Sequence, residues 1–276
     1  MLKKLLKYDL RAIFKYWWIL AISSVGLSII GGMCLYALTN FIDTDPNALM
    51  IMVAVLGVVA TVIGLSAFLI VTEILIFVRF YKNFFTDEGY LTFTLPVKRS
   101  QLLNSKLIVT VAASLATILI LIVDVVIVFA IGSPDFFNAE IWRAIGWIFG
   151  EAAQALGAYA IVYAIEIVLI GIFVALSSIL LLYICITLAS IIVKKTKVVA
   201  AIGIYYGAYT AVSFAAQLIY IFGLMFLSGT FANIPETAMM GAASLILLVL
   251  LAFVAALCVA LYLLEYYLLD KKLNLA

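Results

Sequence analysis

Histidine is absent from this sequence of 276 residues, and charged side chains make up only 11% of it. Without histidine the chain lacks the side chain that most often transfers protons near neutral pH and most often binds metals. The shortage of charge excludes a soluble globular domain, in which about a quarter of the residues are charged. Because 68% of the residues are hydrophobic and the mean hydropathy is +1.32, the composition predicts an integral membrane protein.

Sequence motifs for metal binding, nucleotide binding and catalysis are also absent. The three cysteines, Cys34, Cys185 and Cys258, lie in apolar runs without the short spacing of a metal or disulfide motif, which favours buried packing. The chain has no G-x-x-x-x-G-K-[ST] loop, and nothing in it pairs a nucleophile with a positioned base. We therefore predict no catalytic, cofactor or metal site in the chain itself, and no nucleic-acid partner.

Six apolar runs, in contrast, are each long enough to cross a bilayer, which takes about 20 residues of α-helix. The alternating pattern of a membrane β-barrel is absent. We expect an all-α, polytopic membrane protein whose residues 1–276 form a single transmembrane domain. The expected spans are approximately 16–41, 48–78, 107–132, 160–192, 199–228 and 240–269.

The basic residues predict how these spans are oriented. With the N-terminus inside, 15 of the 16 lysine and arginine residues fall in cytoplasmic segments, and Arg143 alone falls outside. Because lysine and arginine are enriched in the cytoplasmic loops of membrane proteins, both termini are expected in the cytoplasm. Residues 79–106 then form the one large cytoplasmic loop, and residues 133–159 form the main extracellular segment.

Residues 1–15 have the pattern of an amphipathic helix, with apolar residues at steps of three or four beside a basic stripe. Like charges at this spacing repel one another in water, whereas anionic headgroups stabilise them by about 1 kcal/mol per basic residue. We expect an interfacial helix on the inner leaflet, which is compatible with a simple role in fixing the topology. The apolar residues are Leu2, Leu6, Leu10, Ile13 and Trp17, and the basic residues are Lys3, Lys7, Arg11 and Lys15.

The extracellular segment contains a second amphipathic stretch, "EIWRAIGWIFGEA". It places Ile141, Ile145, Ile148 and Phe149 on one helical face, with two tryptophans beside them. This pattern predicts an interfacial helix on the outer leaflet that anchors the chain.

Acidic residues within the spans are functional candidates, because isolated charges are costly inside a membrane. Glu73 and Glu265 each lie about 9 Å from the inner boundary, at 1.5 Å of helix rise per residue. Asp124 and Glu166 lie toward the outer ends of their spans. Pairing with interfacial lysine or arginine is one interpretation, and a role in substrate passage or gating is the other. The second interpretation suits Asp124 and Glu166 best.

The fifth span carries a stripe of small residues at four-residue steps, Gly203, Gly207, Ala211 and Ala215. Small residues at this spacing let two helix backbones approach closely. The spacing alone is equally compatible with a contact inside the subunit and with a contact between subunits.

The loop of residues 79–106 carries apolar residues for which this chain offers no obvious core. Exposed apolar residues on a short element imply a partner surface or the membrane face. The acidic and basic residues beside them favour a docked protein, with a loop packed on itself as the alternative. Span 2 is expected to continue as a helix through "RFYKNFF" before this loop. The apolar residues are Tyr90, Leu91, Phe93, Leu95 and Val97, and the charged residues are Asp87, Glu88, Lys98 and Arg99.

The stretch "TDEGYLTFTLPVKRSQLLNSK" resembles the loop between spans 2 and 3 in permease subunits of bacterial ABC exporters of the type-2 class, especially Gram-positive ones. In that family an acidic-Gly-Tyr-Leu stretch leads to Leu-Pro, a basic pair and a Leu-Leu-x-x-Lys run. The matching positions are Asp87, Glu88, Gly89, Tyr90, Leu91, Leu95, Pro96, Lys98, Arg99, Leu102, Leu103 and Lys106.

The resemblance implies a half-transporter in the bacterial cytoplasmic membrane, in which two six-span subunits, alike or different, pair with two cytosolic ATPase subunits. Residues 86–97 would form the coupling helix that docks on the ATPase. The chain would not be an enzyme by itself, since ATP would be hydrolysed on the partner. Spans 1 and 5 meet at the dimer interface in that family, which favours a subunit contact for the small-residue stripe. The predicted ATPase-docking residues are Asp87, Glu88, Tyr90, Leu91, Phe93 and Leu95.

The function expected from these features is export of a hydrophobic or amphipathic substrate, such as an antimicrobial peptide, a drug or a lipid. Two other functions stay open, an ion-coupled secondary transporter and a membrane scaffold or sensor subunit that does not transport. One departure from the family is that the outer bulk lies between spans 3 and 4, rather than between spans 5 and 6.

Overall fold

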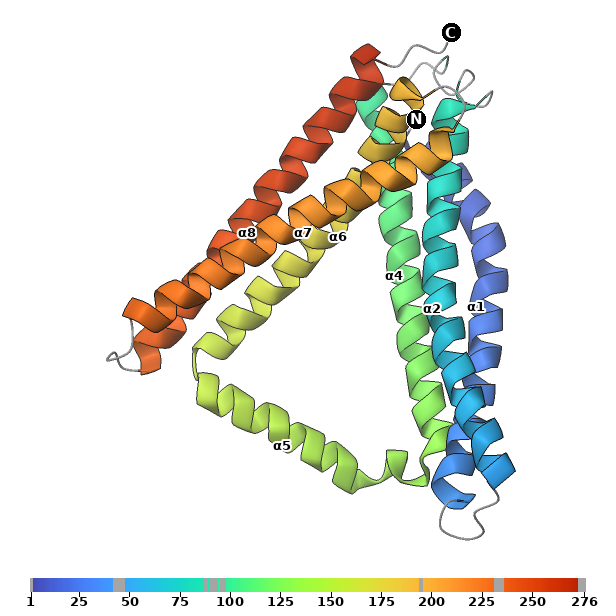
Figure 1. Cartoon of the computed structure of the whole chain (residues 1–276), viewed down its shortest axis with the longest axis vertical. Coiled ribbons are helices and arrows are strands. Elements are labelled where there is room, and N and C mark those ends of the chain that lie inside the picture. The colour runs from blue at the N-terminus through green and yellow to red at the C-terminus, as the bar shows by residue number, and fades with distance from the viewer. Residues whose placement is uncertain are drawn as a thin grey trace. The chain divides into compact units, whose positions relative to one another are not determined.

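A computed structural model describes residues 2–41, 48–86, 89, 94, 98–193, 196–230 and 236–272. The regular elements within these ranges are all helical (Figure 1). The elements are α1 (Leu2–Phe41), α2 (Ala48–Phe85), α4 (Arg99–Gly132), the 3₁₀-helix η1 (Pro134–Phe137), α5 (Ala139–Leu156), α6 (Tyr159–Ile192), α7 (Lys197–Thr230), α8 (Glu236–Tyr267) and the π-helical turn η2 (Leu268–Lys272).

Six of these helices, α1, α2, α4, α6, α7 and α8, are long and apolar enough to cross a membrane. This confirms the predicted all-α architecture and its six apolar spans. The helices extend beyond the predicted spans at their charged ends: α1 begins at Leu2, α2 continues through "RFYKNFF" to Phe85, and α4 begins at Arg99. Residues 2–15 therefore continue without a break into the first apolar span, and their position at the membrane surface stays a prediction.

The contacts within the chain divide it into two compact units, each described here by itself. Unit 1 comprises Met1–Phe80 and Asn104–Ile148, and unit 2 comprises Tyr81–Leu103 and Phe149–Ala276. Helices α2 and α4 each continue from one unit into the other. The single transmembrane domain stays a prediction.

In unit 1, helices α1, α2 and α4 run side by side along their length (Figure 1). One apolar cluster joins Ile13 of α1 to Ile76 of α2 and to Val109 and Ala113 of α4. A second cluster surrounds Trp17, whose indole Nε1 donates a hydrogen bond of 2.9 Å to the Thr117 hydroxyl. Trp17 is thus buried within unit 1, although the sequence suggests an interfacial position for it.

Glycines let α1 and α2 pack closely in unit 1. Gly31 lies against the side chain of Thr61, and Gly57 lies against Cys34, so that a Cβ atom at either glycine would overlap its neighbour. Helices in membranes associate largely through van der Waals contact, and a missing side chain lets two backbones approach. The two helices therefore depend on glycine at these positions.

Unit 2 is built from α6, α7 and α8, and its core is formed by one end of α6. Residues Ile179–Leu181 and Tyr183–Thr187 of α6 are buried, whereas most residues before Ser177 are half-buried or exposed. At the opposite end of α6 the Tyr163 hydroxyl donates a 2.6 Å hydrogen bond to the Met240 carbonyl of α8. Helix α6 therefore contacts α8 near both of its ends.

Helix α5 confirms the helix predicted from "EIWRAIGWIFGEA", and none of its residues is buried. The Trp142 indole donates a hydrogen bond of 3.0 Å to the Phe136 carbonyl and so joins the start of α5 to η1. Its position on the outer leaflet stays a prediction.

Candidate functional site

An ion-pair cluster in unit 1 connects three helices through one aspartate. Asp9 of α1 is buried, and the Lys106 ammonium of α4 donates a hydrogen bond of 2.6 Å to its Oδ1. The Arg79 guanidinium of α2 lies 3.5 Å from the same oxygen. The side chains of Asp9 and Lys106 are each only 7% exposed, so this pair is largely removed from solvent.

Helix periodicity explains why these three side chains meet. Asp9 lies one turn before Ile13, Arg79 lies three residues after Ile76, and Lys106 lies three residues before Val109. The apolar cluster of Ile13, Ile76 and Val109 therefore sets the register, and the charged residues form the next layer toward the α1 N-terminus. We call Asp9, Arg79 and Lys106 the Asp9 clamp.

The Asp9 clamp carries two cations for one carboxylate. Asp9 Oδ2 is buried and has no hydrogen-bond partner among the described residues. A buried ion pair offsets its desolvation only when charges and hydrogen bonds are well placed, and removing one partner is strongly destabilising. These three contacts therefore persist only while α1, α2 and α4 keep their positions relative to one another.

The predicted coupling loop of residues 79–106 begins and ends at the Asp9 clamp, with Arg79 at one end and Lys106 at the other. Within unit 2, Arg99 of the same loop donates a hydrogen bond of 3.2 Å to the Leu269 carbonyl, and its Nε lies 4.0 Å from Asp270. The loop is thus joined to the first helix of the chain through its two ends and to the end of α8 through Arg99.

The predicted docking residues of this loop lie outside the described residues; they are Asp87, Glu88, Tyr90, Leu91, Phe93 and Leu95. Gly89 is described, and its amide donates a hydrogen bond of 2.7 Å to the Thr86 carbonyl. A Cβ atom at Gly89 would lie 2.5 Å from the Phe84 carbonyl oxygen. Glycine is therefore required here by the close approach of the chain to the end of α2.

The two predicted pathway acids lie in different units. Asp124 belongs to unit 1, is fully buried and accepts a hydrogen bond of 3.2 Å from the Ser28 hydroxyl of α1. Glu166 belongs to unit 2 and is also buried, at 4% exposure. One carboxyl oxygen of each residue has no partner in the part of the chain that the structure describes. Their role in a pathway stays a prediction.

Glu265 is the third deeply buried acid of the spans, whereas Glu73 is exposed on α2. The Glu265 Oε1 accepts a hydrogen bond of 2.8 Å from the Thr187 hydroxyl of α6. Among the described side chains, a hydroxyl is thus the hydrogen-bond partner of this carboxyl, and pairing with lysine or arginine stays a prediction.

The small-residue stripe of α7 lies on a side of the helix that unit 2 leaves uncovered. Gly203, Gly207 and Ala211 are exposed and Ala215 is half-buried. A Cβ atom at Gly203 or Gly207 would meet nothing within 4 Å. Gly203 and Gly207 therefore pack against no described residue of unit 2, and the assignment of the stripe to a subunit interface stays a prediction.

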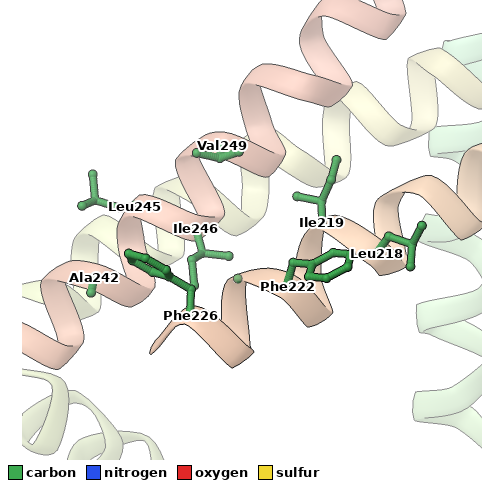
Figure 2. Close-up of a pocket in the computed structure, with 9 residues that line it drawn as sticks. Leu218, Ile219, Phe222, Phe226, Ala242, Leu245, Ile246 and Val249 are labelled. Carbon is green, nitrogen blue, oxygen red and sulfur yellow. The ribbon is translucent and has the colours of Figure 1, made fainter. Parts of the chain in front are cut away.

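An apolar groove of about 520 Å³ lies between α7 and α8 (Figure 2). Gly223 lets α7 approach Ile246, because a Cβ atom there would lie 2.9 Å from the Ile246 Cγ2. None of the described residues that line this groove has a polar side chain, and no sequence pattern pointed to it. Its lining residues are Leu218, Ile219, Phe222, Gly223, Phe226, Ala242, Leu245, Ile246 and Val249.

The most informative residue that sequence reasoning missed is Asp9. The signal was present, because Asp9 is the one acidic residue among the first 15 and lies one turn from both Leu6 and Ile13 on the apolar face. An acid on an apolar helical face requires a buried cation or hydrogen-bond donor. The cations that pair with Asp9 come from helices far away in the sequence, so the sequence pattern alone does not identify them.

These features define an all-helical protein with six helices able to span a membrane and with a buried ion-pair cluster at one end of its first unit. Comparison of the chain with protein-family models, with curated proteins and with solved structures finds no match.

Proposed function

We propose that this chain is the membrane-spanning subunit of a bacterial exporter that a separate, ATP-hydrolysing cytosolic subunit drives. It belongs in the cytoplasmic membrane with both termini in the cytoplasm. It pairs with a second permease subunit through the α7 stripe. The substrate is hydrophobic or amphipathic, because the spans offer few charges to a strongly polar one.

The Asp9 clamp is the observation that carries this proposal. A loop that receives force from a partner must be joined to the helices that it moves. Here both ends of the loop meet on Asp9, where Lys106 lies 2.6 Å and Arg79 lies 3.5 Å from a single oxygen. Displacement of residues 86–97 would pull directly on α1 through this shared anchor.

Unit 2 offers a second route for the same displacement. Residues 81–103 belong to unit 2, and Arg99 contacts the end of α8 through the Leu269 carbonyl. Because α2 and α4 continue into unit 1, movement of the loop would act on both units at once. Alternating access requires such a simultaneous shift of helices between inward-open and outward-open states.

The α7–α8 groove and the buried acids are candidates for substrate contact. The groove volume lies within the range of about 300–1,000 Å³ that small-molecule sites occupy, and its walls are apolar. Asp124 and Glu166, with one unpartnered oxygen each, could contact polar groups of an amphipathic substrate.

The decisive experiment is affinity purification of the intact chain and of the triple variant Tyr90→Ala, Leu91→Ala, Phe93→Ala. We expect an ATP-hydrolysing protein to co-purify with the intact chain and to be lost from the variant. The matched control is Phe137→Ala, an exposed aromatic residue of the predicted extracellular segment. Absence of any ATP-hydrolysing partner from the intact chain contradicts the exporter function, and equal binding to the triple variant contradicts only the docking assignment.

An ion-coupled secondary transporter is the second candidate, favoured by the buried carboxyls of Asp124 and Glu166. It predicts that Asp124→Asn or Glu166→Gln abolishes transport by vesicles lacking every ATP-hydrolysing protein. If the chain is instead part of an ATP-driven exporter, even the unsubstituted chain should show no transport in such vesicles. A scaffold or sensor subunit would bind its partner without substrate-stimulated ATP hydrolysis.

A further inference from the structure

Asp124 lies in unit 1 where α4 packs against α1. Its side chain is fully buried, and its Oδ1 lies 3.2 Å from the Ser28 Oγ of α1. Ser24, one turn before Ser28, also interacts with this carboxyl. Farther along the same contact Gly32 fits against Ile131, since a Cβ atom at Gly32 would lie 2.8 Å from the Ile131 Cβ. The Asp124 carboxyl is therefore closed off from solvent as long as α1 and α4 stay packed.

The two serines have no hydrogen to spare for Asp124. A serine hydroxyl carries one hydrogen and two acceptor lone pairs. The Ser28 hydrogen has two acceptors in reach, the Val25 carbonyl at 2.8 Å and Asp124 Oδ1 at 3.2 Å, and the nearer of them lies in its own helix. The Ser24 hydroxyl likewise donates to the Ala21 carbonyl at 3.0 Å. A hydrogen on Asp124 itself would complete the contact with Ser28.

No cation among the described residues balances Asp124. Asp9, another buried acid where α1 meets α4, has the Lys106 ammonium at 2.6 Å and the Arg79 guanidinium at 3.5 Å. The groups that act on Asp124 are the two serine hydroxyls of α1, and no charged or titratable side chain in the described parts of α1, α2 or α4 pairs with it. An isolated carboxylate is too costly to bury in an apolar interior, where such a group takes up a proton instead. Asp124 therefore needs a neutralising ligand.

We infer that Asp124 is a proton-binding site whose occupancy holds α1 against α4. With the proton on Oδ1, Asp124 donates to the Ser28 Oγ, and Ser28 keeps its own hydrogen on the Val25 carbonyl. Each hydrogen then has one acceptor, and no net charge is buried. A metal ion fits this site less well. Hard cations such as Ca²⁺ and Mg²⁺ take about six or more oxygen ligands, whereas the described side chains here offer one carboxyl and two hydroxyls.

This site goes beyond the proposed ATP-driven export, because it acts through α1 and α4 alone and needs no partner protein. When these two helices separate during a conformational change, water reaches Asp124. The Oδ1–H bond then breaks, a water molecule takes the proton, and a carboxylate is left, because an aspartic acid in water is ionised at neutral pH. Packing α1 and α4 together again requires the carboxylate to take up a proton. Each opening and closing of this contact would thus release and bind one proton.

The direct test is infrared difference spectroscopy of the purified full chain in nanodiscs at neutral pH. The C=O stretch of a protonated carboxyl absorbs at higher frequency than the stretches of a carboxylate. We expect a carboxylic-acid band that is lost in Asp124→Asn, whose amide can still donate to the Ser28 Oγ, and kept in the control Glu73→Gln, an exposed acid of α2. Ser28→Ala removes the acceptor of the proton and should move the band. An Asp124→Asn spectrum that keeps the whole band, or a band that Ser28→Ala leaves unmoved, overturns the inference.

The second test follows the unfolding midpoint of the same variants in detergent between about pH 5 and about pH 8. Because the packed state holds a proton that the unfolded chain releases, the intact chain should become less stable as the pH rises. Asp124→Asn should lose about one proton of this dependence, and Glu73→Gln should keep it. Equal pH dependence in the intact chain and in Asp124→Asn overturns the proton site. Stabilisation by Na⁺ over K⁺ at equal ionic strength, lost in Asp124→Asn, assigns the site to a metal ion and also overturns it. Both tests use the chain alone, so their failure leaves the exporter function standing.

Discussion

Two buried carboxyl groups, Asp9 in unit 1 and Glu265 in unit 2, each have a partner on a neighbouring helix, and the two partners differ in kind. In unit 1, Asp9 meets Lys106 and Arg79, so that charge is balanced by charge. In unit 2, Glu265 accepts a hydrogen bond from the neutral Thr187 hydroxyl. Removing one partner of a buried ion pair is strongly destabilising, whereas a hydroxyl hydrogen bond adds a modest and local contribution.

The two units also differ in how closely some of their glycines pack against neighbouring helices. Gly31 and Gly57 of unit 1 lie against side chains of the facing helix, whereas Gly203 and Gly207 of unit 2 have open space where a side chain would stand. Unit 1 therefore uses its small residues to pack upon itself. Unit 2 packs Gly223 against Ile246 but leaves Gly203 and Gly207 on a face that its described residues do not cover, which suits the proposed subunit contact.

The largest expected effect is that of Asp9→Asn. This change keeps the side-chain volume but leaves Lys106 and Arg79 without their buried anion, which costs about 3–5 kcal/mol. The free energy of unfolding in detergent, from denaturant titration of the purified chain, measures the loss. Lys15→Gln, an exposed charge on the same helix, is the control. A loss no larger than that of the control would show that the clamp does not hold unit 1 together.

A smaller effect is expected from adding one methyl group to a glycine, and its sign should differ between the units. Gly31→Ala forces a Cβ atom against Thr61 and should destabilise the chain by about 1–3 kcal/mol. Gly207→Ala enters open space and should be neutral, or stabilising by up to about 1 kcal/mol through helix propensity. Thermal unfolding of the two variants side by side checks the difference. Equal destabilisation by both variants would contradict the open face of α7.

Thr187→Val should have the smallest effect of the three. It removes the hydroxyl donor to Glu265 with little change in shape, at a cost of about 0.6–2 kcal/mol for a hydrogen bond between membrane helices. The same denaturant titration measures it, and Thr210→Val, an exposed threonine of α7, is the control. A cost that matches Asp9→Asn would show that unit 2 depends on its polar contact as strongly as unit 1 does.

Much of the fold could be predicted because its signal lies along the chain. The apolar runs identified all six spans, the amphipathic stretch after Gly132 identified α5, and "RFYKNFF" was expected to continue α2. The predicted spans began at residues 16 and 107, because charged residues were taken as the ends of spans, whereas α1 begins at Leu2 and α4 at Arg99. Helices α1 and α4 instead extend through their charged residues, and charges of both are satisfied in the Asp9 clamp.

The candidate site was only partly accessible to such reasoning. Residues 79–106 stood out by composition, and Asp124 and Glu166 stood out as acids in apolar runs. The clamp could not be found in this way, because Lys106 is 97 residues from Asp9 along the chain. The α7–α8 groove is likewise lined by apolar residues of two helices, such as Phe222 and Leu245, that carry no signal by themselves.

The sequence by itself determined that this protein is helical and that six of its segments are long and apolar enough to cross a membrane. It also determined where along the chain the charges lie. These properties are accessible because hydrophobicity and helical period are local. The tertiary structure decided which helix covers which face. It placed Trp17 and Asp9 inside unit 1 and left Gly203 and Gly207 of α7 without a described neighbour. The helical period of apolar residues shows which face of a helix needs a neighbour. Which segment becomes that neighbour depends on the packing of residues far apart in the sequence.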